Sequence, residues 1–125
     1  FLGTVGTERP SEHNPDYYGS KGSLPVVVRS LAKALRGSGV TANLVSPGMI
    51  ATSEVRDMLQ RRAARHNIHG WDEVQRWALE NSMPNLTGRI PDPEDIGRYV
   101  VFVASDVAWH LTGIDFKADG GAIDA

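Results

Sequence analysis

Apolar residues recur at two spacings along the chain and predict helices that alternate with strands. A helical period runs over about residues 17–36, where Asp16 is placed to cap the helix and Pro25, inside it, predicts a kink. Residues 40–46 form a short run rich in β-branched side chains, which predicts a largely buried strand. Phe1-Leu2 has the character of the last residues of an earlier strand.

The second half of the chain repeats this alternation after an interruption. Apolar residues at helical spacing predict one helix from Ser53 and a short one from Trp71, followed by a loop over residues 83–91. Asp92-Pro93-Glu94-Asp95 is a helix start, with an acid at the cap and proline at the first position. Residues 113–119 alternate apolar and polar side chains, which predicts a strand with one polar face.

Strands that alternate with long helices are typical of parallel α/β sheets with crossover helices. The sequence therefore predicts one α/β domain over residues 1–125, with a doubly wound parallel sheet and a helical insertion at residues 53–91. Only two full strands are present, too few to carry helices on both faces of a complete sheet. The expectation is that the chain forms half of such a domain.

Composition narrows the function classes. A net charge of −2 gives no electrostatic basis for binding nucleic acid or an anionic membrane, and no cysteine is present to form disulfides. No apolar run has the length of a membrane span and the first residues lack a signal-peptide pattern, so a cytoplasmic protein is expected. His66 and His69 have no third ligand nearby, and no metal site is predicted.

Tyr17 and Lys21 are the first candidates for chemistry. Four residues apart on a helix, they share one face, and an ammonium beside a phenol favours the phenolate, which makes tyrosine a usable general acid or base. Thr4 follows the first strand, and a Pro-Gly turn at residues 47–52 follows the next one. Because ligands of parallel α/β sheets bind at the carboxyl ends of the strands, these groups are expected to converge on one crevice.

Four motifs, in this order and at these spacings, resemble the classical branch of the short-chain dehydrogenase/reductase family. The resemblance covers essentially the whole chain, as the family's C-terminal half, and implies a Rossmann-like, doubly wound parallel sheet of which only that half is present. Its residues are Thr4, thirteen before Tyr17, where the family places its catalytic serine; Tyr17-x-x-x-Lys21; Pro47-Gly48-x-Ile50-x-Thr52; and Asp119-Gly120-Gly121 after the last strand.

The resemblance implies hydride transfer between NAD or NADP and a secondary alcohol or ketone. It implies that Tyr17 gives or takes the hydroxyl proton, that Lys21 binds the nicotinamide ribose and favours the phenolate, and that Thr4 hydrogen-bonds the substrate oxygen. Tyr18 is a competing phenol, but it lies three residues from Lys21, not four. Threonine in place of serine keeps the hydroxyl and adds a methyl group.

The resemblance further implies that the Pro47-Gly48 backbone, with Ile50 and Thr52, holds the nicotinamide carboxamide. The family's Gly-rich phosphate loop, and the residue that selects NAD or NADP, belong to the N-terminal half and are not in this stretch. A 125-residue chain by itself would not hold the adenosine and pyrophosphate in the family's usual way.

The insertion corresponds to the family's mobile lid over the substrate, where Met58, Trp71 and Trp77 hint at an apolar, cyclic substrate; packing of the lid against the core is the equal alternative. The partners expected are a small alcohol or carbonyl compound and further copies of the chain, as a dimer or tetramer. Two other functions stay open: a truncated or inactive relative that acts by subunit association, and a sugar-nucleotide epimerase or dehydratase, which shares Tyr-x-x-x-Lys but is disfavoured by the Pro-Gly motif.

Overall fold

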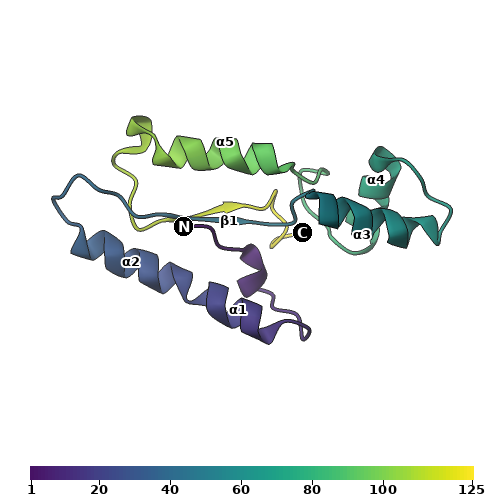
Figure 1. Ribbon diagram of the computed structural model, residues 1–125, viewed down its shortest axis with the longest axis horizontal. Coiled ribbons are helices and arrows are strands. Elements are labelled where there is room, and N and C mark those ends of the chain that lie inside the picture. Colours follow the sequence, from purple (N-terminus) through teal and green to yellow (C-terminus); the bar gives the residue numbers. More distant parts are fainter.

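The computed structural model describes residues 1–125 and has a parallel sheet between two layers of helices (Figure 1). Strands β1 (Leu44–Pro47) and β2 (Asp115–Ala118) pair in parallel, from Leu44 opposite Asp115 to Pro47 opposite Ala118. Leu2 adds an isolated parallel bridge to Val45 on the other edge of β1. The α/β class and the parallel sheet are therefore confirmed.

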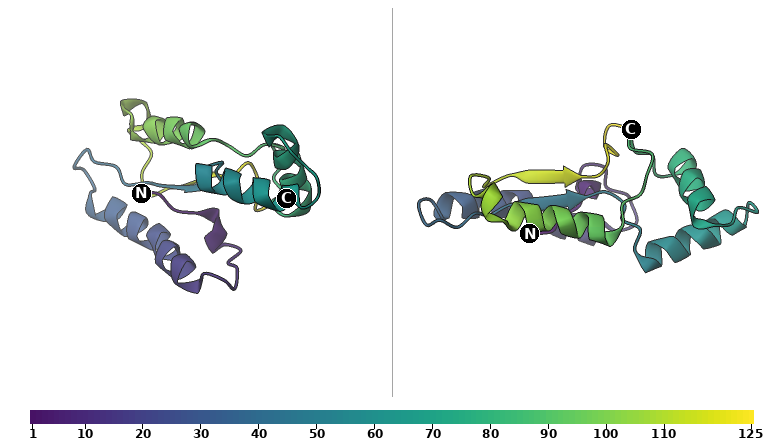
Figure 2. Two further views of the ribbon diagram at one scale, coloured as in Figure 1. Left: turned by 45° about the vertical axis from the view of Figure 1, so that its right-hand side comes forward. Right: turned by 90° about the horizontal axis from the view of Figure 1, so that it is seen from above.

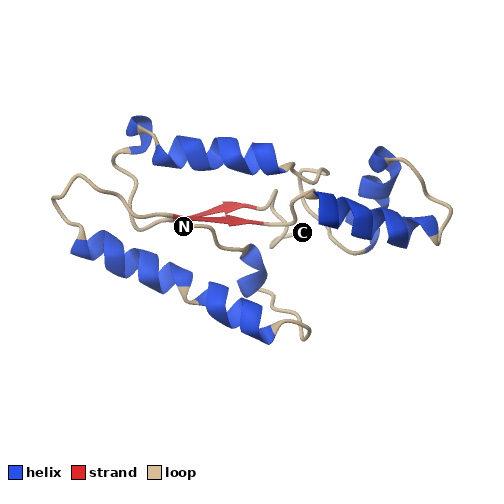
Figure 3. Ribbon diagram, in the orientation of Figure 1, coloured by secondary structure: helices blue, strands red, loops and turns tan.

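Helices cover both faces of the two-stranded sheet, although two strands were expected to be too few for this. Helices α1 (Pro15–Gly22) and α2 (Leu24–Ala34) lie along one face, and α5 (Pro93–Ala104) lies along the other (Figure 3). Helices α3 (Ser53–Ala64) and α4 (Trp71–Asn81) lie beyond the carboxyl ends of the strands, as Figure 1 and the right-hand view of Figure 2 show. None of these helices combines the length and the apolar character that crossing a membrane would require.

The predicted kink at Pro25 is confirmed, because the helical period over residues 17–36 is divided into α1 and α2 at Ser23. A proline near the start of α2 has no N–H to donate to the preceding turn, so the first helix ends and the second begins. The predicted cap was wrong. Asn14 occupies the cap position and Pro15 the first helical position, which places Asp16 inside the first turn.

The strand expected over residues 40–46 is shorter and shifted. Pairing with β2 begins only at Leu44 and extends through Pro47. Before it, the side chain of Asn43 donates to the Leu111 carbonyl at 2.7 Å and accepts from the Ile114 N–H at 3.2 Å. This buried side-chain amide joins the two segments that lead into β1 and β2. It takes the place of the strand pairing that was expected there.

Strand β2 has the predicted alternation of faces. Phe116 lies edge-on to Tyr99 of α5, with ring centroids 6.1 Å apart. On the opposite face, Asp115 accepts a 2.6 Å hydrogen bond from Ser46 of β1, and Lys117 pairs with Glu8 at 2.7 Å. The polar face of β2 is therefore occupied by contacts to β1 and to the N-terminal segment, not by solvent alone.

The insertion has a small core of its own. Thr52 caps α3 by accepting from the Val55 N–H at 3.3 Å. Helices α3 and α4 then pack against each other and bury a cluster that is distinct from the residues under the sheet: Ala51, Leu59, Ala63, Val74, Ala78 and Ile90. Both helices begin at the residues that the sequence predicted.

Helix α5 begins with the predicted acidic cap. The Asp95 carboxylate accepts from the Asp92 N–H at 3.0 Å and pairs with Arg98 at 2.9 Å. Asp92 in turn pairs with Arg56 of α3 at 2.5 Å, which joins the insertion to the start of α5. The remaining elements are two short 3₁₀ helices, η1 (Val5–Thr7) and η2 (Asp106–Ala108).

We expect Asp95→Ala to lower the free energy of unfolding of the complete protein by about 1 kcal/mol, because it removes the carboxylate that accepts from the Asp92 N–H at the start of α5. Glu94→Ala is the matched control, since Glu94 lies in the same first turn and makes no side-chain hydrogen bond. It should cost only about 0.3 kcal/mol, through the helix dipole. Urea titrations compare the two, and losses of equal size would contradict the role of the cap.

Candidate active site

A cleft of about 430 Å³ opens beside the carboxyl ends of the strands. We call it the carboxyl-end cleft. Five segments line it: the residues around η1, the start of α1, the turn after β1, the loop after α4 and the C-terminal turn after β2. Its lining includes Thr4, Tyr17, Tyr18, Gly48 and Asn85. Three of the sequence-predicted site residues, Thr4, Tyr17 and Gly48, therefore meet at one cleft.

Thr4 is held by the turn that it begins. Its Oγ1 accepts from the Gly6 N–H at 3.1 Å, and its carbonyl accepts from the Thr7 hydroxyl at 3.0 Å. A threonine hydroxyl that accepts one bond keeps its own proton for donation. Gly6 must be small here, because a Cβ at this position would lie 2.9 Å from the ring of Tyr18.

Tyr17 and Tyr18 differ in their surroundings, although both line the cleft. The Tyr17 side chain is exposed and makes no hydrogen bond to the protein, whereas Tyr18 is half-buried over η1 and directs its hydroxyl to Ser11 at 3.5 Å. The two rings lie edge to face with centroids 5.4 Å apart. Tyr17 is thus the phenol whose hydroxyl is free for a ligand.

Lys21 lies one turn after Tyr17 on α1 and does not line the cleft itself. Its Nζ donates to the Leu2 carbonyl at 2.9 Å, which fixes the ammonium beside the end of the first strand segment. Two of the three ammonium donors remain without a protein acceptor. The pair is therefore positioned from two elements, α1 and the residues before η1.

The turn after β1 is narrow because it approaches the C-terminal turn. The Gly48 N–H donates to the Ala118 carbonyl at 3.3 Å, and a Cβ on Gly48 would lie 3.0 Å from the Cα of Asp119. Pro47 is buried at the end of β1. The next two backbone N–H groups, of Met49 and Ile50, donate to no acceptor in the protein.

Ile50 and Thr52 lie behind this turn, outside the lining of the cleft. Ile50 is half-buried and its carbonyl accepts from the Thr52 N–H at 2.8 Å. Hydrogen bonds with the backbone N–H of Glu54 and the hydroxyls of Thr52 and Ser53 lower the pKa of the Glu54 carboxyl. In this structure Thr52 serves the start of α3.

The three residues named for the lid, Met58, Trp71 and Trp77, pack against the core of the insertion. Trp71 lies under the Arg56 guanidinium, 4.0 Å from the ring centroid. Trp77 lies beside the His66 ring, with centroids 5.3 Å apart. The insertion contributes to the cleft instead through the loop that follows α4, with Ser82, Met83, Pro84 and Asn85.

Comparison with known proteins identifies the chain. The family model described as enoyl-(acyl carrier protein) reductase matches residues 1–122. The chain belongs to the short-chain dehydrogenase/reductase family.

Individual members resemble the chain over most of its length. An uncharacterised oxidoreductase of Bacillus subtilis, YvaG, is 29% identical over 98% of this chain and 47% of its own length. The 2,3-dihydro-2,3-dihydroxybenzoate dehydrogenase of Escherichia coli is 34% identical over 85% of this chain and 41% of its own. A short chain dehydrogenase family protein from Francisella tularensis has a crystal structure that matches with a TM-score of 0.74, at 29% identity, over 99% of this chain and 50% of that one.

The chain thus spans under half the length of these two curated relatives. The Rossmann-type α/β fold expected from the sequence is confirmed, with this chain covering about half of the solved short-chain dehydrogenase/reductase structure.

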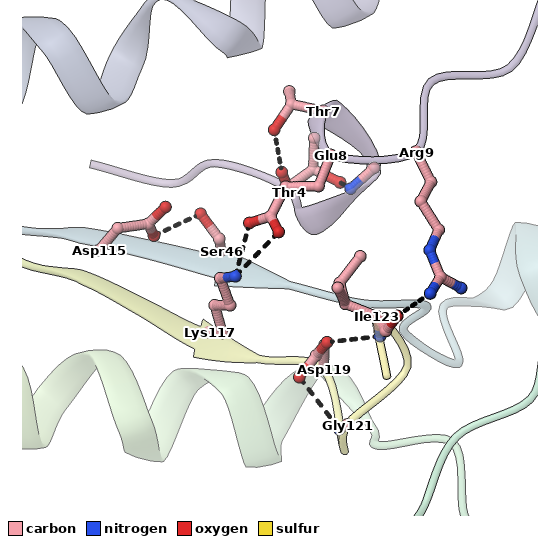
Figure 4. Close-up of polar contacts among 11 residues, drawn as sticks. Thr4, Thr7, Glu8, Arg9, Ser46, Asp115, Lys117, Asp119, Gly121 and Ile123 are labelled. Carbon is pink, nitrogen blue, oxygen red and sulfur yellow. Dashed lines mark hydrogen bonds and ion pairs between the residues drawn. The ribbon is translucent and has the colours of Figure 1, made fainter. Parts of the chain in front are cut away.

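One side of the cleft in this short-chain dehydrogenase/reductase is closed by contacts that no sequence pattern predicted. Figure 4 shows the contacts between the residues after η1 and the C-terminal strand and turn. Glu8 pairs with Lys117 of β2, and the Arg9 guanidinium donates to the Ile123 carbonyl. Asp119 holds the turn itself by accepting from two backbone N–H groups. Residues 8–16 have no apolar period, so nothing marked Glu8 or Arg9 in advance.

The Glu8–Lys117 pair should make the stability of the folded protein change with pH in the alkaline range. The pKa of the Lys117 ammonium is raised above its ordinary 10.5, first by its hydrogen bond to Glu8. A pKa that is higher in the folded state than in the unfolded state stabilises the fold. This contribution is complete at pH values below the unfolded-state pKa and is lost as pH rises through the folded-state pKa. We expect Glu8→Gln to lower Tm by a constant amount up to about pH 10, and the difference from wild type to shrink above that.

Glu12→Gln is the matched control, because Glu12 is an exposed acid in the same loop that pairs with no cation. Thermal melts of the complete protein at a series of alkaline pH values provide the measurement. The pairing would be contradicted if the Tm difference between Glu8→Gln and wild type stayed unchanged above about pH 11. That pH is on the order of half a unit above the ordinary pKa of lysine.

Proposed function

We propose that the complete protein is an NAD- or NADP-dependent oxidoreductase that interconverts a secondary alcohol and a ketone, to which this chain contributes the C-terminal half of the domain. The observation that carries the proposal is the meeting of Thr4, Tyr17 and the Gly48 turn at the carboxyl-end cleft. Family membership supports the reaction type, since the relatives bear the names of dehydrogenases and reductases.

Tyr17 is the proposed general acid and base. Its hydroxyl has no partner in the protein, so it is free to exchange its proton with the substrate oxygen. Thr4 is proposed to donate its hydroxyl proton to the same oxygen, since its lone pair already accepts from the Gly6 N–H. Tyr17 then transfers the proton, while Thr4 holds the substrate oxygen, whose charge changes during the reaction.

The residues beside the cleft fit a nicotinamide nucleotide. The free N–H groups of Met49 and Ile50 suit a carboxamide oxygen, and the two free donors of Lys21 suit ribose hydroxyls. When bound, the cofactor supplies or accepts the hydride at the substrate carbon. The role of Ile50 and Thr52 in orienting the ring is part of this proposal, through the backbone turn that Thr52 stabilises at the start of α3.

Tyr17→Phe in the complete protein should lower kcat by at least about 100-fold, because the proton donor is lost while the ring is kept. Binding of NAD or NADP, measured by fluorescence titration, should change little. Tyr18→Phe is the control, because Tyr18 is the neighbouring phenol and packs over η1. Full activity in Tyr17→Phe would sink the acid–base assignment.

The Thr4 hydroxyl can be tested by two substitutions of similar size. Thr4→Val should lower kcat/KM by about 100-fold, since it removes a hydroxyl aimed at the substrate oxygen. Thr4→Ser keeps the hydroxyl and should retain most of the activity. Steady-state kinetics with one alcohol and its ketone would show the difference, and equal loss in both variants would assign Thr4 to folding of η1.

A relative without catalytic activity, acting by subunit association, is the second candidate. The observation that favours it is a set of exposed apolar side chains on two helices: Val26, Val27 and Leu31 of α2, and Val100, Val101 and Phe102 of α5. A homo-oligomer would cover such a surface in either case. Sedimentation together with the Tyr17 kinetics separates the candidates, because only the enzyme loses turnover on Tyr17→Phe.

A further inference from the structure

Arg9 brings a cation into the carboxyl-end cleft. It lies two residues after η1 and lines the same cleft as Thr4 and Tyr17. The other lining residues are neutral except for Asp119. A guanidinium is always charged near neutral pH, so the cleft contains a permanent positive charge beside the proposed reacting groups.

The Arg9 guanidinium is incompletely used by the protein. One of its nitrogens donates to the Ile123 carbonyl, as Figure 4 shows. None of the three ion pairs of the structure includes it, since they join Arg56 with Asp92, Arg98 with Asp95, and Lys117 with Glu8. Arginine carries five N–H donors in a planar fork, so four of them have no acceptor here.

The two acids closest to Arg9 in the sequence and in the cleft are engaged elsewhere. Glu8, its neighbour in the chain, pairs with Lys117 at 2.7 Å. The two oxygens of Asp119 accept from the Gly121 N–H at 3.0 Å and the Ile123 N–H at 3.2 Å, which holds the C-terminal turn. The Ile123 carbonyl at the end of that turn then orients Arg9. The protein therefore positions the guanidinium without pairing it with a carboxylate.

We propose that Arg9 is a specificity-determining residue that pairs with a carboxylate on the substrate. The inference rests on the proposed oxidoreductase function and narrows its substrate class to hydroxy acids and keto acids. A carboxylate matches the planar fork of a guanidinium and can accept two parallel hydrogen bonds from it. The apolar skeleton between the carboxylate and the reacting carbon would contact Met49 of the turn after β1 and Met83 of the loop after α4, which both line the cleft.

The test compares each acid with its own neutral ester. Wild-type complete protein, Arg9→Gln and Arg9→Lys are assayed with NAD and NADP on 3-hydroxybutyrate and 4-hydroxycyclohexanecarboxylate, each beside its methyl ester. We expect wild type to prefer the acid, and Arg9→Gln to lower the acid-to-ester ratio of kcat/KM by about 10- to 100-fold, mainly through KM. Arg9→Lys should fall between, because an ammonium keeps the charge and loses the fork.

Arg36→Gln is the matched control, since Arg36 is an exposed arginine that precedes β1, at the opposite end of the strands from the cleft. It should leave the ratio at the wild-type value. An acid-to-ester ratio that is the same in wild type and Arg9→Gln would overturn the assignment of Arg9 while leaving the oxidoreductase proposal intact.

If no compound is turned over, a binding measurement separates the carboxylate-binding role of Arg9 from the oxidoreductase function. Saturation-transfer NMR of the same acids and esters with wild type and Arg9→Gln reports occupancy of the cleft without catalysis. Binding of the acids that depends on Arg9, with no turnover of any compound, would support the carboxylate site and overturn the oxidoreductase function. Neither turnover nor Arg9-dependent binding would overturn both.

Discussion

The parallel pairing of β1 with β2 is the constraint on which the site depends. Because the two strands run in the same direction and in register from Leu44–Asp115 to Pro47–Ala118, their carboxyl ends emerge together at one edge. The two turns that follow approach so closely that a Cβ on Gly48 would lie 3.0 Å from the Cα of Asp119. A larger residue at position 48 would push apart the two walls of the carboxyl-end cleft.

The two faces of β2 position different parts of the structure around the paired strands. Its apolar face meets α5 through Phe116 and Tyr99, while its polar face holds Ser46 and Glu8 through Asp115 and Lys117. A period of two along one short strand therefore fixes both the helix layer and the loop that carries Arg9. The loop is positioned by side-chain contacts across 109 residues of sequence, since it contains no secondary structure of its own beyond η1.

Local signals predicted the helices well, and long-range contacts account for most of what they missed. Starts at Ser53, Trp71 and the Asp92 cap follow from capping and period, which are properties of a few neighbouring residues. The extent of β1 depends on its partner strand, so a run at residues 40–46 could not fix it. Thr4, Tyr17 and Gly48 were placed at one edge by strand order alone, whereas Arg9 and Asn85 reach the cleft through tertiary contacts that no spacing encodes.

The packing of the insertion bears on where substrate selection can occur. Trp71 and Trp77 contribute their apolar area to the core between α3 and α4, and Arg56 holds that unit against Asp92 at the start of α5. Side chains used in this way stabilise the shape of the insertion and have little freedom to adapt to a ligand. In the proposed enzyme, contacts with a substrate would therefore fall to the loop after α4 and to the turn held by Asp119, two segments that line the cleft together with Tyr17. A selective charge on one of the cleft's own loops, such as Arg9, is the kind of determinant that this arrangement favours.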